Sequence, residues 1–145
     1  MTSHDIELGA DLVTQAARLL RVMRRRHSLG SGPRVLSVLD QLGPSTVTAL
    51  ATAYQSSQPT MSGLVAQLEE QGWVTKSPHP QDTRASLVAL TAAGTAELTR
   101  VRRTYGEDVA ARIAAHPTLT TEQLSTAVEV LHELLSDLST EDPAS

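Results

Sequence analysis

The side chains best suited to chemistry in this sequence are hydroxyl and amide groups gathered in one short stretch. Between positions 57 and 67 they are Ser57, Gln58, Thr60, Ser62 and Gln67. Such groups donate and accept hydrogen bonds, which suits them to phosphate oxygens and to base edges exposed in the major groove of DNA. The alternative interpretation is a solvated helix face that begins with a serine or threonine cap.

A second candidate is the run Asp82-Thr83-Arg84, which follows two closely spaced prolines. In an extended segment, residues two apart point to the same side. We therefore expect Asp82 to hold the guanidinium of Arg84, or the loop backbone, while Arg84 reaches a narrow minor groove. The alternative is a surface ion pair worth about 0–1 kcal/mol. Further candidates for contacts with the DNA backbone are Thr46, Thr48 and Lys76. Lys76 could equally be a solvated strand residue.

Other chemistries find little support in the sequence. The chain has no cysteine, which excludes disulfides, thiolate metal sites, cysteine catalysis and thiol redox sensing. The five histidines show neither H-x-x-x-H spacing nor a nearby acidic cluster, so we expect no metal and no cofactor. No Ser/His/Asp arrangement or phosphate-binding loop stands out, and a hydrolase using His79 or His116 would need a polar pocket that the sequence does not indicate. We therefore expect a protein that is not an enzyme.

The charge balance is unusual for a protein that binds nucleic acid. The net charge is −4, although phosphate contacts depend on Lys and Arg at the docking face. The densest basic run, Arg24-Arg25-Arg26, ends a predicted helix, where positive charge complements the helix dipole or faces a partner. The first residues carry acids where a signal peptide needs basic residues, and no apolar run has the length of a membrane span. We therefore expect a cytoplasmic protein with no membrane partner.

The elements that must position these candidates follow from apolar periodicity and from Gly and Pro breaks. Apolar residues at three- and four-residue spacing predict helices over residues 6–27, 33–42, 46–53, 57–71, 92–115 and from 120 onward. Two strands, 73–77 and 85–90, flank a polar tip over 78–84. The third and fourth helices, joined by a tight polar turn, form a helix-turn-helix, and the hairpin that follows it is a wing.

The last predicted helix carries an unusually apolar face. Five apolar residues repeat at spacings of 4, 3, 4 and 3, as in a heptad-like seam. A helix this apolar at the end of a small chain needs a surface to cover it. The seam residues, which we expect to contact a partner surface, are Leu124, Val128, Leu131, Leu135 and Leu138.

Four segments in register resemble the multiple-antibiotic-resistance regulator (MarR) family. Residues 58–65 look like the start of its recognition helix, and residues 68–74 like the exit into its wing. Asp82-Thr83-Arg84 matches the Asp-x-Arg of the wing tip, and residues 90–94 match the Leu-Thr-x-x-Gly that opens the long fifth helix. Two positions depart from the pattern, since Gly63 and Thr83 stand where the family often has arginine.

The resemblance implies a mainly α fold with a small β-hairpin wing. Residues 33–91 would form the winged helix-turn-helix lobe, and residues 1–32 and 92–145 a helical dimerisation region. It further implies a homodimer that binds double-stranded DNA at a pseudo-palindromic operator and represses transcription. Release by a small aromatic or phenolic effector is also implied. The alternative is a winged-helix module that binds another protein and has weak or no DNA binding. Outside the last helix, the dimerisation residues would be Leu8, Leu12, Val109 and Ile113.

Overall fold

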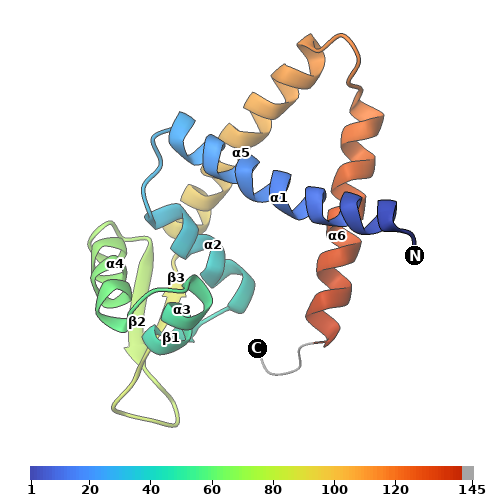
Figure 1. The fold of residues 1–145 in the computed structure, drawn as a ribbon. Helices are drawn as coiled ribbons and strands as arrows, with labels where there is room; N and C mark the ends of the chain where they lie inside the picture. The colour runs from blue at the N-terminus through green and yellow to red at the C-terminus, as the bar shows by residue number, and fades with distance from the viewer. Residues whose placement is uncertain (142–145) are drawn as a thin grey trace. The chain divides into compact units, whose positions relative to one another are not determined.

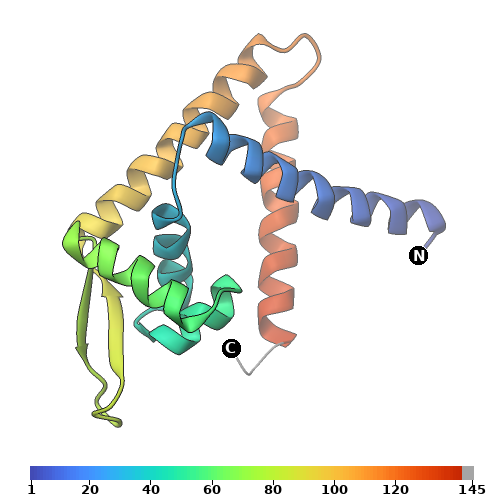
Figure 2. The same ribbon diagram turned by 60° about the vertical axis from the view of Figure 1, so that its left-hand side comes forward.

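The computed structural model describes residues 1–141, which fall into two compact units divided after Arg102. Figures 1 and 2 show long helices and a short helical lobe that carries a hairpin. The elements are α1 (Ser3–Arg26), α2 (Gly32–Leu42), β1 (Ser45–Thr46), α3 (Val47–Tyr54), α4 (Gln58–Glu70), β2 (Val74–Pro78), β3 (Ser86–Leu90), α5 (Ala92–Ala115) and α6 (Thr121–Glu141). The mainly α fold with a β-hairpin wing, expected from the sequence, is confirmed.

The sheet contains one strand that the sequence analysis did not predict. β3 is the central strand of three, with the order β1-β3-β2 and antiparallel pairing throughout. In the predicted hairpin, Val74 pairs with Leu90 and Pro78 with Ser86. The unpredicted strand β1 has only two residues, and its Ser45 pairs with Val88. This short strand ties the start of α3 to the wing.

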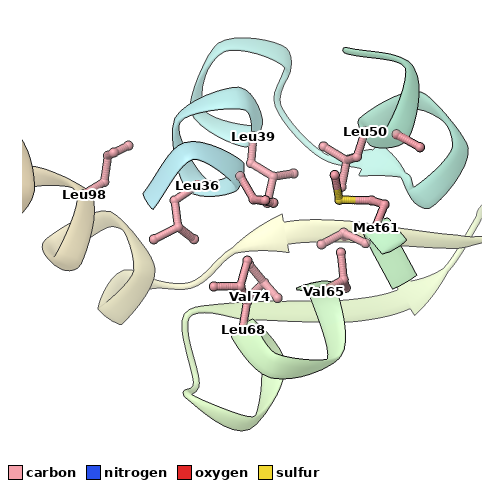
Figure 3. Close-up of a cluster of buried hydrophobic side chains, with 11 residues drawn as sticks. Leu36, Leu39, Leu50, Met61, Val65, Leu68, Val74 and Leu98 are labelled. Atoms are coloured by element: carbon pink, nitrogen blue, oxygen red, sulfur yellow. The ribbon is translucent and has the colours of Figure 1, made fainter. Parts of the chain in front are cut away.

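A single apolar cluster holds the lobe together (Figure 3). It collects side chains from α2, α3, α4, both hairpin strands and the first turns of α5. Each fully buried side chain of this kind contributes roughly 1.5–3 kcal/mol of hydrophobic stabilisation. Because all these elements share one core, the positions of α3, α4 and the hairpin relative to one another are fixed. The members with the least exposed side chains are Val35, Leu36, Leu50, Met61, Val65 and Val88.

Side-chain caps set where the helices begin. α1 begins at Ser3, one turn before the predicted start at residue 6, because Thr2 and Asp5 form a capping box. The bond from the backbone N–H of Thr2 lowers the pKa of the Asp5 carboxyl. Thr46 caps α3, since its hydroxyl accepts from the Ala49 N–H at 3.1 Å. These caps replace hydrogen bonds that the first turn of a helix otherwise lacks.

The junction between the wing and α5 explains the Leu-Thr-x-x-Gly segment. The backbone N–H of Thr91 donates to the Trp73 carbonyl at 3.1 Å, and its hydroxyl donates to the Gly72 carbonyl at 2.6 Å. That hydroxyl also accepts from the Gly94 N–H at 3.0 Å, as a helix cap does. A Cβ on Gly94 would fall on the carbonyl oxygen of Trp73. Glycine is required here because backbone meets backbone.

Beyond Arg102, the chain forms the rest of α5 and all of α6. The predicted cap of α6 is present: Gln123 Oε1 accepts from the Thr120 N–H at 2.9 Å, and Thr120 Oγ1 accepts from the Gln123 N–H at 3.2 Å. None of the described residues of α6 is buried. Leu135 and Leu138 are 63% and 62% exposed. The apolar seam is therefore uncovered within one chain.

Within the part of the chain that the structure describes, no helix combines the length and apolar character needed to cross a membrane.

Candidate nucleic-acid interface

α3 and α4 form the predicted helix-turn-helix, and a left-handed residue makes the turn. Gln55 adopts φ 61 and ψ 47, which ends α3, and the Ser56 N–H donates to the Ala51 carbonyl at 2.9 Å. Arg34 braces the same turn from α2. Its guanidinium lies 4.1 Å from the centre of the Tyr54 ring and donates to the Tyr54 carbonyl at 3.3 Å. The angle at which α4 leaves α3 is thus fixed by local contacts.

The N-terminus of α4 is capped by two of the predicted DNA-binding residues. Ser57 Oγ accepts from the Thr60 N–H at 3.2 Å and donates to Thr60 Oγ1 at 2.8 Å. Because Thr60 accepts in the second bond, its own hydroxyl proton stays available for an external oxygen. The backbone N–H of Gln58 and the helix dipole favour a phosphate at this end. Pro59 lies at a position where a missing N–H costs nothing.

A polar groove brings together six of the eleven predicted DNA-binding residues. It has a volume of about 320 Å³ and lies between the start of α3, the exposed side of α4 and the hairpin. Val47, Ala85 and Ser86, which the sequence analysis did not select, complete its walls. Its two cationic side chains come from the hairpin, one from β2 and one from the tip. The predicted residues in the groove are Thr46, Thr48, Gln58, Ser62, Lys76 and Arg84.

The wing tip is a tight turn, and the predicted extended conformation is wrong. The Ala85 N–H donates to the Asp82 carbonyl at 3.1 Å, which closes the turn. Asp82 Oδ1 accepts from the Arg84 backbone N–H at 3.0 Å and lies 3.5 Å from Arg84 Nε. The sequence left open whether Asp82 holds the guanidinium or the loop backbone, and in the structure its carboxylate contacts both. The turn arises because an Asp carboxylate readily caps a backbone N–H two residues on. The Arg84 side chain stays 94% exposed.

The remaining predicted residues lie outside the groove. Ser57 and Thr60 form the cap of α4, while Asp82 and Thr83 lie on the exposed tip. Gln67 instead lines a second cavity of about 260 Å³ beside Trp73.

Two further residues of this lobe bear on the interface. His79, considered in the sequence only as a metal or catalytic residue, accepts two backbone hydrogen bonds within the tip. The signal that could have identified it is the following proline, which has no N–H to compete. Gly63 lies in open space on the exposed side of α4, where a Cβ would meet no atom within 4 Å. Its lack of a side chain therefore has no packing cause.

No group of three or more His, Asp or Glu side chains in residues 1–141 is arranged to hold a metal ion.

Comparison with known proteins agrees with this geometry. A model of the MarR family matches residues 34–86. An HTH-type transcriptional regulator of Mycobacterium tuberculosis is 31% identical over 143 residues, which cover 94% of this chain and 99% of that protein. The fold is similar to apo MarR from Escherichia coli, with a TM-score of 0.65 at 22% identity over 89% of this chain and 94% of that one. It is also similar to a transcriptional regulator from Thermotoga maritima, with a TM-score of 0.68 at 20% identity over 96% and 99% of the two chains.

Proposed function

The chain belongs to the MarR family of winged helix-turn-helix transcriptional regulators, and we propose that it acts as a homodimeric repressor in the cytoplasm. Each copy places α4 in the major groove of a half-site and its wing tip in the neighbouring minor groove. The two half-sites lie about one helical turn apart on a pseudo-palindromic operator. Bound there, the dimer blocks access to the promoter, and the protein carries out no catalysis.

The polar groove carries this proposal. Hydroxyl, amide, ammonium and guanidinium groups from α3, α4 and the hairpin share one surface, and all three elements are fixed by the same core. These groups can donate hydrogen bonds to the acceptor atoms of DNA phosphates and base edges. Operator selection with purified protein and random duplexes tests the proposal, because it reports binding, half-site sequence and half-site spacing together. Failure to enrich any sequence at low salt would favour the protein-binding module instead.

Arg84→Ala is expected to weaken operator binding by about 1–3 kcal/mol, because the tip loses its exposed guanidinium. Fluorescence anisotropy over a series of salt concentrations measures both the affinity and its salt dependence. If Arg84 contacts a phosphate, the slope of log affinity against log salt falls by about 0.9. Arg103→Ala removes the same charge from α5, where Arg103 pairs with Glu107, and serves as control. Equal operator affinity of wild type and Arg84→Ala would contradict the proposed contact between the wing tip and DNA.

Dimerisation is supported by the uncovered seam of α6. Val128, Leu131, Leu135 and Leu138 are between 36% and 63% exposed. A second copy of the chain offers the same seam, as a two-fold interface requires. In the other unit, the apolar residues Ile6 and Leu8 of α1 are also more than half exposed, and we propose that they take part in pairing as well. Val109, Ile113 and Leu124 are half-buried and are proposed to complete it.

We place the effector in the cavity beside Trp73, which Leu64 and Leu68 line on its apolar side. Glu97 forms part of the wall, and the hydrogen bond from Arg100 lowers its pKa. Glu97 is therefore a carboxylate at neutral pH and acts as a hydrogen-bond acceptor, which favours a phenol, whose hydroxyl can donate, over an aromatic carboxylate, which cannot. A ligand that binds the DNA-free arrangement more tightly than the DNA-bound one would release the operator. The ratio of these two ligand affinities sets how far operator binding weakens.

Trp73 is the only tryptophan of the chain, so its fluorescence reports directly on this cavity. We expect phenol to change the Trp73 emission and to release the operator, and benzoate to do so more weakly because it has no proton to donate to the Glu97 carboxylate. Glu97→Gln should reduce the difference between the two compounds. An unchanged Trp73 emission at millimolar concentrations of both compounds would contradict the placement.

A further inference from the structure

The imidazole of His79 organises the wing tip from within. Its Nδ1 accepts from the backbone N–H of Gln81 at 3.1 Å and from that of Asp82 at 3.2 Å. The backbone N–H of His79 donates to the Ala85 carbonyl at 3.1 Å, on the other side of the tip. One ring nitrogen thus holds both residues that lead into the Asp82–Arg84 turn.

The same arrangement occurs a second time in the chain. At the corner between α5 and α6, Nδ1 of His116 accepts from the Thr118 N–H at 3.2 Å and from the Leu119 N–H at 3.3 Å. Both histidines precede a proline. Proline restricts the chain and has no N–H of its own, so the next two N–H groups turn back toward the histidine ring. His-Pro-x-x is therefore a recurrent turn in this protein, with the imidazole as acceptor.

We propose that His79 is a positioning residue for DNA recognition, whose neutral imidazole orders the turn that presents Arg84 and whose protonation releases it. The link runs through Asp82, whose N–H is held by His79 and whose carboxylate holds the Arg84 N–H. A doubly protonated imidazole is a donor at both nitrogens and can accept neither bond. Acidification therefore removes both bonds, and operator affinity falls as the pH falls. This inference rests on the proposed DNA binding of the wing.

The charged groups around His79 belong to the hairpin itself. Asp82 and Arg84 pair with each other on the tip, and Lys76 lies on β2. Both ribbon views show the tip projecting beyond α3 and α4 (Figures 1 and 2).

Two substitutions of His79 distinguish the effect of losing the hydrogen-bond acceptor from the effect of losing the imidazole ring. His79→Ala removes the acceptor, and we expect about tenfold weaker operator binding at pH 7.5. In His79→Asn, the amide oxygen takes the place of Nδ1 without titrating, so its affinity should stay within about threefold of wild type. On acidification from pH 7.5 to pH 5.5, the affinity of wild type should fall about tenfold relative to His79→Asn, because a protonated imidazole no longer accepts the two backbone bonds. His4→Ala, at the exposed start of α1, is the control for loss of a histidine elsewhere.

Nuclear magnetic resonance of the free protein tests the turn without DNA. The amides of Gln81 and Asp82 should lose protection from hydrogen exchange in His79→Ala and in acidified wild type, but keep it in His79→Asn. The backbone amides of Thr118 and Leu119, which donate to His116, serve as a comparison for hydrogen-exchange protection within the same spectra. Equal operator binding by wild type and His79→Ala, or equal pH dependence of wild type and His79→Asn, overturns the role of His79. Failure of wild type to bind any duplex overturns the proposed function as well.

Discussion

Gly94→Ala is expected to destabilise the protein by about 3 kcal/mol or more. The added Cβ would occupy the position of the Trp73 carbonyl oxygen, which itself accepts from the Thr91 N–H. Backbone on both sides of the contact cannot rotate away as a flexible side chain would. Either α5 separates from the base of the wing, or β2 loses its register with β3. The free energy of unfolding in urea, followed by circular dichroism, measures the loss.

Gly106→Ala is the matched control for this substitution. Gly106 lies in the interior of the same helix, and a Cβ there would meet no atom within 4 Å. Alanine in a helix interior is favoured over glycine by about 1 kcal/mol, so this variant should be as stable as wild type or more stable. Opposite signs of the two effects would identify the Trp73 contact as the cause. Equal stability of Gly94→Ala and wild type would rule out the close approach.

Replacing Leu131 and Leu135 together by lysine is expected to abolish operator binding, by at least about a hundredfold, because it separates the dimer. Both side chains lie on the exposed seam of α6. Two added positive charges would by themselves strengthen attraction to DNA, so a loss of binding cannot come from charge. Light scattering coupled to size exclusion measures the expected fall from the mass of two chains to that of one.

Thr126→Lys is the control for the seam variant. It lies on the opposite side of α6, one turn from Glu122 and Glu129, and should leave the dimer and its operator affinity intact. Circular dichroism of the seam variant should keep the helical signal of the wing lobe, because none of the described α6 side chains contributes to the buried core. A seam variant that stays dimeric would place the dimer interface elsewhere.

Most of the architecture could be predicted because apolar periodicity and breakers act locally. Val35, Leu36 and Leu39 on α2, and Met61, Val65 and Leu68 on α4, repeat at helical spacing, and the structure buries all six. Gly-Pro and His-Pro pairs mark the ends of the segments in the sequence itself. The polar surface of α4 could be anticipated for the same reason, since polar residues that do not belong to the apolar face of a helix must lie on its exposed face.

The features that escaped prediction depend on partners distant in sequence or on atoms of a single turn. β1 has two residues and no periodicity of its own, and only the edge of β3 gives it a partner. The turn at Asp82 depends on a single hydrogen bond from the Arg84 backbone N–H to the Asp82 carboxylate. An aspartate suggests such a bond, but the spacing of residues in the sequence does not predict it. Gln67 follows Gln58 by nine residues and Ser62 by five, which places it close to the opposite side of α4 at about 3.6 residues per turn, beside Trp73 and away from the groove.

The contact between Gly94 and Trp73 gives the lobe a mechanical property. Backbone packed on backbone leaves little room for bending, so we expect the base of the hairpin and the first turn of α5 to rotate together. The five residues of β2 place the tip about 17 Å from this joint at about 3.3 Å per residue. A rotation of α5 by about 10° would therefore displace Arg84 by about 3 Å, the length of a hydrogen bond. Small changes in helix orientation are in this way converted into the presence or absence of contact.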